Sequence, residues 1–253
     1  MQLTWDLRFE LKPNTWVFVP TAKSIEDGKQ IKNLLASIWR PPKNYFHLRS
    51  GGHVAALKFH QSNTIFAHLD IQRFFGSINK SRVTRALTGL ISYKVAREIA
   101  TLSTVIHPVE KTLILPFGFV QSPMLASLCL SQSALGTCLS GLPKKYRVRA
   151  SVYVDDIVLS GWSEASVRLA MDAVKAAAER SRFSLNDAKE QGPSPAITVF
   201  NIDLTHASIA VTADRFSKFI DAFQSTSNVF ERKGIFNYIN SISSAQAATL
   251  PPI

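Results

Sequence analysis

The feature that most constrains this chain is a pair of adjacent carboxylates, Asp155 and Asp156, inside an otherwise apolar stretch. Aliphatic residues alternate before the pair and run continuously after it (Val148, Ala150, Val152, Val154; Ile157, Val158, Leu159). The pattern predicts strands over 148–154 and 157–160, joined by a turn at the two aspartates. Two carboxylates at the tip of such a hairpin repel each other and are costly to desolvate, so they need a reason to be there. A tight Asp-Asp turn is the structural alternative.

A third carboxylate, Asp70, ends another predicted strand over 65–70. The period of two puts Ile65, Ala67 and Leu69 on one face and Phe66, His68 and Asp70 on the other. In the sheet that the element order predicts, this strand lies beside the hairpin, so the three carboxylates converge. Three converging carboxylates form a hard-oxygen site for Mg²⁺. Two such ions about 3.5–4 Å apart can clamp the attacking and leaving oxygens of a phosphoryl transfer.

The remaining pattern predicts an α+β fold. Apolar spacing predicts helices that start near Ser24, at residue 83, at Ser122-Pro123 (continuing through Leu139) and after Ser163. Strands are predicted over 54–59 and 197–204, and a short helical tail over 214–247. From residue 65 the order is strand, helix, helix, hairpin, helix, strand. This order is close to a ferredoxin-like arrangement, an antiparallel sheet with helices on one face.

Charge is unevenly distributed along the 253 residues. Residues 1–150 carry 20 Lys or Arg against 7 Asp or Glu, whereas residues 151–253 carry 9 against 11. A basic half of this size indicates a nucleic-acid backbone as partner, or else a surface that serves only solubility. The two cysteines exclude a disulfide scaffold and a multi-cysteine zinc site. With no apolar run near the roughly 20 residues of a membrane segment, and a start unlike a signal or transit peptide, we expect a cytoplasmic protein.

Four segments, in this order along the chain, resemble the motifs of reverse transcriptases. Asp70 with Phe74-Phe75-Gly76-Ser77-Ile78 resembles motif A, and residues 115–123 (LPFGFVQSP) resemble motif B. Tyr153-Val154-Asp155-Asp156 resembles the Tyr-x-Asp-Asp box of motif C, and residues 185–189 (LNDAK) resemble motif D. The resemblance covers about residues 45–205. Residues 119–123 and 47–53 (FVQSP, HLRSGGH) are similar to the bacterial defence-associated and abortive-infection branch.

The resemblance implies a right-hand polymerase with fingers, a ferredoxin-like palm and a short helical thumb. The implied domains are an N-terminal region with fingers over 1–64, a palm over 65–205 with part of the fingers inserted around 90–115, and a thumb over 206–253. A thumb this short predicts low processivity, or help from a bound RNA or another subunit. A homo-oligomer or an effector protein is a further expected partner.

The resemblance also implies a role for each carboxylate and for the aromatic pair. Asp70 and Asp155 would hold two Mg²⁺ ions, with Asp156 assisting and the carbonyl of Ile71 completing a shell. Phe75 matches the steric-gate position, where a bulky ring excludes a ribose 2′-OH and so favours dNTPs over ribonucleotides. Plain core packing is the alternative for one of the two rings at 74 and 75.

Other implied site residues are basic or lie in motif B. Lys189 matches the motif D lysine, a candidate general acid for the departing pyrophosphate, and a solvated loop lysine is its alternative. Arg49 and Lys58 flank a predicted hairpin over 50–57, where the fingers would contact the triphosphate, although lone basic residues are usually only solvated. His53 touches the same site or fills a turn. Motif B contributes substrate-binding residues Phe117 and Gln121; Phe117 replaces a frequent glutamine, which puts the usual grip on the nucleotide in doubt.

Three functions are therefore open. The leading hypothesis is an RNA-directed DNA polymerase that uses dNTPs and two Mg²⁺ ions, copies an RNA template such as a dedicated structured non-coding RNA into DNA, and serves antiphage defence. The second is a template-independent or protein-primed nucleotidyl transferase. The third is a catalytically idle RNA-binding scaffold that keeps the polymerase fold.

Overall fold

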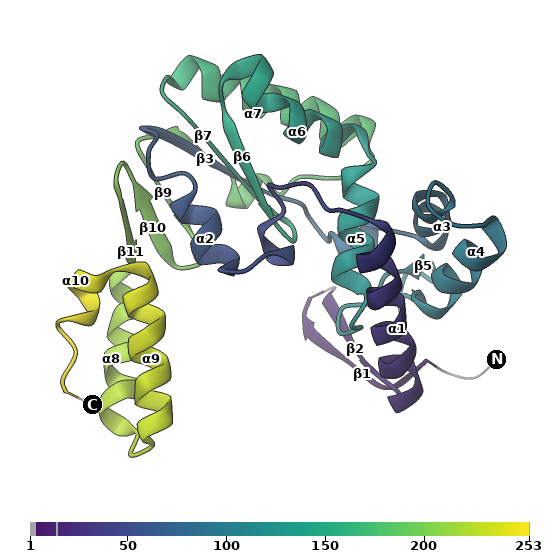
Figure 1. The fold of residues 1–253 in the computed structure, drawn as a ribbon, viewed down its shortest axis with the longest axis horizontal. Helices are drawn as coiled ribbons and strands as arrows, with labels where there is room; N and C mark the ends of the chain where they lie inside the picture. Colours follow the sequence, from purple (N-terminus) through teal and green to yellow (C-terminus); the bar gives the residue numbers. More distant parts are fainter. Residues whose placement is uncertain (1–3, 14, 253) are drawn as a thin grey trace.

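The computed structural model describes residues 4–13 and 15–252, a mixture of helices and antiparallel strands (Figure 1). The strands are β1 Trp5–Lys12, β2 Thr15–Pro20, β3 Ile65–Asp70, β4 Val105–Ile106, β5 Leu113–Ile114, β6 Arg149–Tyr153, β7 Asp156–Gly161, β8 Gln191–Ser194, β9 Ala196–Val199, β10 Ile202–Thr205 and β11 Ser208–Val211. The helices are α1 Ala22–Ile38, α2 Gly52–Lys58, α3 Lys80–Thr88, α4 Tyr93–Leu102, α5 Ser122–Ser131, α6 Ala134–Tyr146, α7 Glu164–Arg180, α8 Ala213–Ser225, α9 Val229–Ile242 and α10 Ser244–Ala247. Short 3₁₀ turns lie at Phe46–Leu48, Phe75–Ser77 and Asp187–Lys189.

The central sheet has the strand order β6-β7-β3-β8, with every neighbour antiparallel. Helices α6 and α7 cover one face, where Ala67 and Leu69 of β3 join the largest buried cluster (Figure 1). The opposite face presents Phe66, which is buried in a second cluster with Leu57 and Val158. The predicted antiparallel sheet and its helical cover are confirmed, whereas the element order from residue 65 also contains α4 and the β4–β5 pair, which were not predicted. Both faces of β3 are covered, so its alternation separates two buried environments.

The predicted strand over 197–204 is wrong, because the chain reverses at Phe200 and Asn201. Both residues have positive φ, +60° and +58°, and the strands on either side form the β9–β10 hairpin of a separate sheet, β11-β10-β9. The strand that pairs with β3 is instead β8. The helices α8, α9 and α10 follow this sheet, as the predicted helical tail requires. The expected border between palm and thumb at residue 205 falls inside the β10–β11 hairpin, and the division into three domains stays a prediction.

The predicted strand over 54–59, and with it the hairpin over 50–57, is wrong. This segment is the helix α2. Gly51 is its N-cap and Gly52 its first residue, and both have positive φ. A short apolar run suits a strand or a helix equally well. Here two adjacent glycines redirect the backbone, and the alanines and leucine that follow favour a helix. Ala56 and Leu57 then pack inward together.

Helix boundaries also differ from the predicted ones. The stripe over 125–139 forms two helices, α5 and α6, bent by 66° at a break where the hydroxyl of Ser133 caps α6 by accepting the Gly136 N–H at 3.2 Å. Ser122 does not cap α5. The N-cap residue is Gln121, whose side chain makes no capping hydrogen bond. The first helix begins at Ala22, capped by Thr21, rather than near Ser24. Helix α3 ends at Thr88, and α4 was not predicted.

An N-terminal hairpin, β1–β2, was also not predicted, and it lies against the motif B segment. The N–H of Phe18 donates to the carbonyl of Phe117 at 2.9 Å, and Val17 forms a parallel bridge with the same residue. Gly118 has φ +113°, and a Cβ at this position would lie 2.3 Å from the carbonyl oxygen of Phe18. The close approach of the hairpin therefore depends on a glycine at 118.

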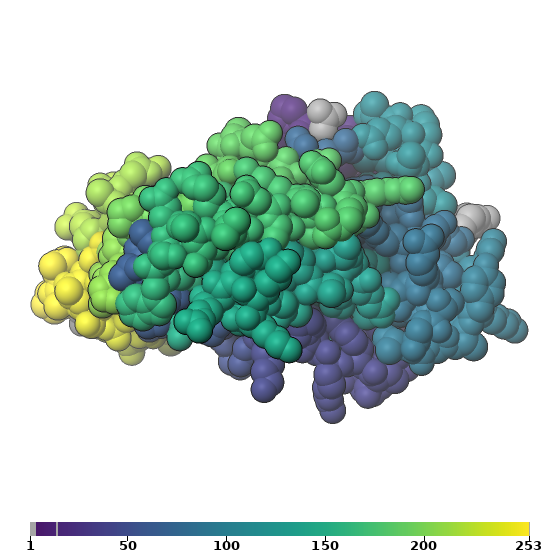
Figure 2. All heavy atoms as spheres, turned by 90° about the horizontal axis from the view of Figure 1, so that it is seen from above, coloured from purple at the N-terminus to yellow at the C-terminus, as the bar shows by residue number. Residues whose placement is uncertain are grey.

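The fold extends from helices α3 and α4 at one end to the C-terminal helices at the other (Figure 1). In the space-filling view the C-terminal segment (yellow) and the segment with α3 and α4 (blue) lie at opposite ends, with the α6–α7 layer (green) between them (Figure 2). In the described part of the chain no single helix is long and apolar enough to cross a membrane. The bent α5–α6 pair has the length and composition of a membrane-spanning segment, but most of α5 is buried inside the protein.

Two glycines of α6 provide a matched test of this packing. A Cβ at Gly136 would lie 2.2 Å from the Leu130 carbonyl oxygen, whereas a Cβ at Gly141 meets nothing within 4 Å. We expect Gly136→Ala to lower the free energy of unfolding by about 1–3 kcal/mol through overpacking. Gly141→Ala should raise it by about 0.5–1 kcal/mol through helix propensity. Urea denaturation measures both, and equal effects of the two variants would contradict the tight α5–α6 junction.

Candidate active site

One cavity of about 630 Å³ opens where the central sheet meets the N-terminal hairpin and the motif B segment. Its walls come from the tip of β1–β2, the end of β3, residues 114–117, the β6–β7 turn and the segment after α7. Residues from all four predicted motifs line it. The lining side chains used below are Lys12, Asp70, Arg73, Phe75, Phe117, Tyr153, Asp155, Asp156, Asn186, Lys189 and Phe200.

Strand pairing brings the three predicted carboxylates together. Asp70, the last residue of β3, is the register partner of Asp156, the first residue of β7. The N–H of Ile71 donates to the carbonyl of Asp155 at 2.9 Å, which holds the turn against the end of β3. Within that turn Val154 has φ +60°. These backbone hydrogen bonds bring the three aspartates to the same edge of the sheet.

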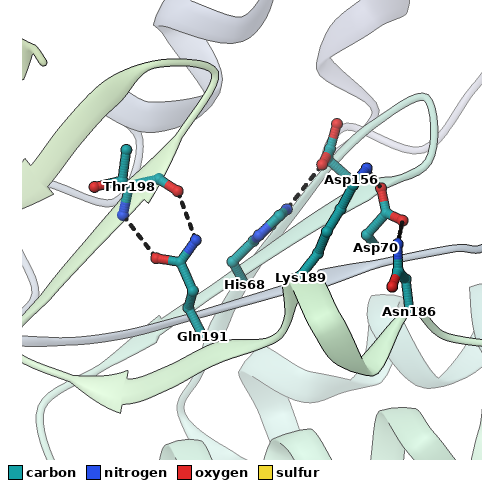
Figure 3. A network of polar contacts seen from close by, with 7 residues as sticks. All are labelled: His68, Asp70, Asp156, Asn186, Lys189, Gln191 and Thr198. Carbon is teal, nitrogen blue, oxygen red and sulfur yellow. Dashed lines mark hydrogen bonds and ion pairs between the residues drawn. The ribbon is translucent and has the colours of Figure 1, made fainter. Parts of the chain in front are cut away.

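Asp70 is 3% exposed, and two side chains from the motif D segment contact it (Figure 3). Lys189 Nζ lies 2.7 Å from Oδ2, and Asn186 Nδ2 donates to Oδ1 at 3.2 Å. The hydrogen bond to Asp70 is the main cause that raises the pKa of Lys189, although burial acts against it. Lys189 is thus protonated and supplies the positive charge beside Asp70. The ammonium of Lys189 therefore has an ion-pair partner, although half of the side chain is exposed.

Asp156 has a different partner, His68. The histidine lies on β3, two residues before Asp70, and its Nε2 is 2.8 Å from Asp156 Oδ1 (Figure 3). The side chain of His68 is 6% exposed. No role was assigned to His68 from the sequence, although the alternation of β3 places it on the same face as Asp70. That shared face was the signal that could have identified it.

Asp155 is the carboxylate of the site whose pKa is raised. Burial, together with the charges of Asp156 and Asp70, raises the pKa of its carboxyl to about 6, while Lys189 opposes the shift. The two neighbouring carboxylates act in the same direction as burial, so the ionised form of Asp155 is costly here unless a cation lies beside it.

Two aromatic rings form a wall of the cavity beside the carboxylates. Phe75 is half-buried and meets Phe117 edge-on, with ring centroids 5.8 Å apart. Phe117 keeps 46% of its surface exposed. Phe74, in contrast, is buried in the core against Phe183. Both phenylalanines line the cavity, but Phe74 is mainly core packing and Phe75 is the more exposed of the two.

Comparison with known proteins decides the family. Residues 20–215 match the family described as reverse transcriptase (RNA-dependent DNA polymerase). The chain belongs to this reverse transcriptase family. No curated protein matches the chain.

Solved structures agree on the fold. The foamy viral protease-reverse transcriptase in complex with double-stranded DNA superimposes with TM-score 0.52 and 16% identity, over 91% of this chain and 35% of that one. Telomerase from Candida albicans, in complex with a fragment of telomeric RNA, gives TM-score 0.51 and 9% identity, over 90% of this chain and 46% of that one. This chain thus spans about a third to a half of their lengths. The predicted α+β polymerase fold is confirmed.

Some predicted residues of this reverse transcriptase domain lie away from the cavity. Gln121 is buried, and its Nε2 donates to Ser103 Oγ at 3.3 Å. Arg49 bonds the Lys43 carbonyl and lies over the Phe46 ring. Lys58 ends α2 and is exposed.

Two basic residues that were not predicted line the cavity instead of Arg49 and Lys58. The basic side chains that line the cavity beside Lys189 are Lys12, at the end of β1, and Arg73, whose Nη2 lies 2.5 Å from Glu110. His53 packs against Tyr153, Phe200 and Tyr238. The hairpin that carries Lys12 was not predicted, so its lysine could not be assigned to the site.

Reverse transcriptase domains generally use divalent metals. The donor chemistry here fits such a cation, because three carboxylates line one cavity, the Lys189 ammonium lies on Asp70, and the pKa of Asp155 is raised. Within the described residues, however, no three His, Cys, Asp or Glu side chains are gathered closely enough to hold one ion. Asp70 is engaged by Lys189 and Asn186, and Asp156 by His68. A cation on Asp70 would therefore take the position of the Lys189 ammonium.

The raised pKa of Asp155 predicts a pH-dependent cost to stability. Between the ordinary pKa of 3.8 and about 6, the folded protein binds more protons at this group than the unfolded chain does, so stability falls as pH rises through this window. Asp155→Asn removes that cost. Without divalent ions we expect a free energy of unfolding about 1–3 kcal/mol above wild type at pH 8, with the gain shrinking towards pH 4. Urea denaturation at both pH values measures it, and a gain independent of pH would contradict the assignment.

Proposed function

We propose that this chain is an RNA-directed DNA polymerase that adds dNTPs by phosphoryl transfer at the cavity of Asp70, Asp155 and Asp156. The observation that carries the proposal is the convergence of these carboxylates from two paired strand ends, with Lys189 on Asp70. Membership of the reverse transcriptase family supports the reaction class. Structural relatives solved with DNA and with RNA support a nucleic-acid partner.

Asp70 and Asp155, assisted by Asp156, would hold two Mg²⁺ ions, which activate the attacking 3′ oxygen and stabilise the leaving pyrophosphate. Lys189 holds a proton at Nζ inside the cavity and can give it to the leaving group. Lys12 and Arg73 place positive charge where a triphosphate would lie. Phe75 and Phe117 bound the space beside the sugar.

The finer parts of the proposal rest on sequence resemblance. Residues 47–53 and 119–123 support a place in the bacterial defence-associated branch, and with it a role in antiphage defence and a dedicated structured non-coding RNA as template. A second subunit or an effector protein is a further proposed partner.

The primary test compares Asp155→Asn with Asp187→Asn on a primed RNA template. Asp187 lies two residues from Lys189 and does not line the cavity, so it matches the charge change without touching the site. We expect Asp155→Asn to lower dNTP incorporation about 100- to 1000-fold, because it removes a cation-binding carboxylate. Asp187→Asn should keep wild-type activity.

The same assay includes a reaction without template. Incorporation that needs the template supports the polymerase, and equal incorporation without it supports a template-independent transferase. Binding of RNA with no incorporation by wild type supports an idle scaffold. Wild-type activity in Asp155→Asn would contradict the site.

Sugar selection tests the aromatic wall. We expect Phe75→Ala to reduce the preference for dNTPs over ribonucleotides by roughly 10- to 100-fold in kcat/KM, because the smaller side chain leaves room for a 2′-OH. Phe230→Ala is the matched control, since that ring is 85% exposed at the start of α9. Single-nucleotide extension with each substrate measures the ratio, and an unchanged ratio in Phe75→Ala would show that another residue selects the sugar.

A further inference from the structure

A chain of hydrogen bonds joins the carboxylate turn to helix α5 through His47. The N–H of Val154 donates to His47 Nδ1 at 3.0 Å, and His47 Nε2 lies 2.6 Å from Ser127 Oγ. The Ser127 hydroxyl in turn donates to the carbonyl of Pro123 at 2.7 Å. His47 comes from a 3₁₀ turn that precedes α2, so three separate segments meet at one imidazole.

These partners define the protonation state of the ring. Because Nδ1 accepts a backbone N–H, it carries no proton. Because the Ser127 hydroxyl already donates to a carbonyl, its oxygen accepts from His47, and Nε2 carries the proton. Burial lowers the pKa of His47 to about 4, so the imidazole is neutral at physiological pH. The ring is thus a fixed, neutral bridge with one acceptor and one donor.

The residue that His47 holds has an unfavourable backbone conformation. Val154 has φ +60°, the left-handed region that a β-branched side chain rarely adopts. Its N–H points at the imidazole, and without that acceptor it would be left unpaired in a partly buried turn. The next residue is Asp155, so the backbone at 154 sets the direction of that carboxylate.

The His47 segment is itself fixed against the sheet. The N–H of Val152 donates to the carbonyl of Asn44 at 2.8 Å, and Tyr45 forms a parallel bridge with Val152. The imidazole also meets the ring of Tyr153 edge-on, with centroids 5.9 Å apart. His47 therefore approaches the turn from a rigid support.

From this geometry we infer that His47 is a positioning residue, which holds Val154 in its left-handed conformation and so aims Asp155 into the cavity. It touches neither a carboxylate nor the cavity, and acts only through the backbone of the turn. The inference rests on the proposed function and extends it. It names a residue that the reaction requires and that lies outside all four motifs.

Four variants test the inference. His47→Asn keeps an acceptor near the position of Nδ1, whereas His47→Gln places its amide near Nε2 and offers Val154 none. His47→Phe keeps the ring contacts without any acceptor. His60→Phe is the matched control, because His60 is buried and its two nitrogens lie 2.7 and 2.8 Å from the hydroxyls of Ser160 and Ser151 on the same two strands, without lining the cavity.

The readouts are Mn²⁺ affinity by electron paramagnetic resonance titration, then kcat and KM for dNTP. We expect His47→Phe and His47→Gln to weaken Mn²⁺ binding and lower kcat about 10- to 100-fold, with KM for dNTP changed less. His47→Asn should stay within about threefold of wild type. His60→Phe should lower thermal stability while leaving Mn²⁺ affinity and kcat of the folded protein unchanged.

Two results would overturn the inference: wild-type Mn²⁺ affinity in His47→Gln, or a loss in folded His47→Asn as large as in His47→Gln. If His47→Phe does not fold, the Asn–Gln pair still decides the question. A wild-type protein that binds Mn²⁺ but incorporates no nucleotide would overturn the proposed function, whereas the Mn²⁺ affinities of the variants would still test His47.

Discussion

The constraint that the site must meet is the mutual repulsion of three carboxylates at the ends of two paired strands. The β3–β7 register sets Asp70 opposite Asp156, and the backbone bond from Ile71 draws Asp155 to the same place. Partners from two segments offset the charges of two of them. Lys189 and Asn186 engage Asp70, His68 engages Asp156, and Asp155 has a raised pKa. A site with this excess of negative charge suits cations, which links the electrostatics of the fold to the proposed chemistry.

Close backbone contacts build the rest of the cavity around those carboxylates. Gly118 lets the N-terminal hairpin approach motif B, which brings Lys12 to one wall and leaves Phe117 against Phe75. On the other side, His47 supports the left-handed turn at Val154. The aromatic wall of the cavity and the carboxylate turn therefore depend on residues that lie far apart in the sequence.

Sequence reasoning predicted the elements whose signal is local and missed those decided by tertiary contacts. The alternation over β3, β6 and β7, and the motif spacing, were enough to bring Asp70, Asp155, Asp156 and Lys189 into one site. The short apolar run at 54–59 was misread, because glycines at 51 and 52 decided in favour of a helix. The sequence of β1 alternates Trp5, Leu7, Phe9 and Leu11 with charged residues, which is typical of a strand. Leu7, Phe9 and Leu11 are nevertheless largely exposed, so the position of this hairpin depends on its contacts with motif B and not on burial of these side chains. Gln121 illustrates the opposite error, since its place in motif B suggested a substrate contact and the packing of α1 buries it.

The central claim is that Lys189 occupies a cation's position on Asp70, and locating a bound cation tests it most directly. Crystals of the protein with Mn²⁺ and a non-hydrolysable dNTP would show the ion by its anomalous scattering. The account predicts anomalous peaks at Asp70 and Asp155, with Lys189 Nζ moved beyond hydrogen-bonding distance of Asp70. A structure in which the nucleotide is bound, no peak lies at these carboxylates and the Lys189–Asp70 ion pair persists at 2.7 Å would contradict it.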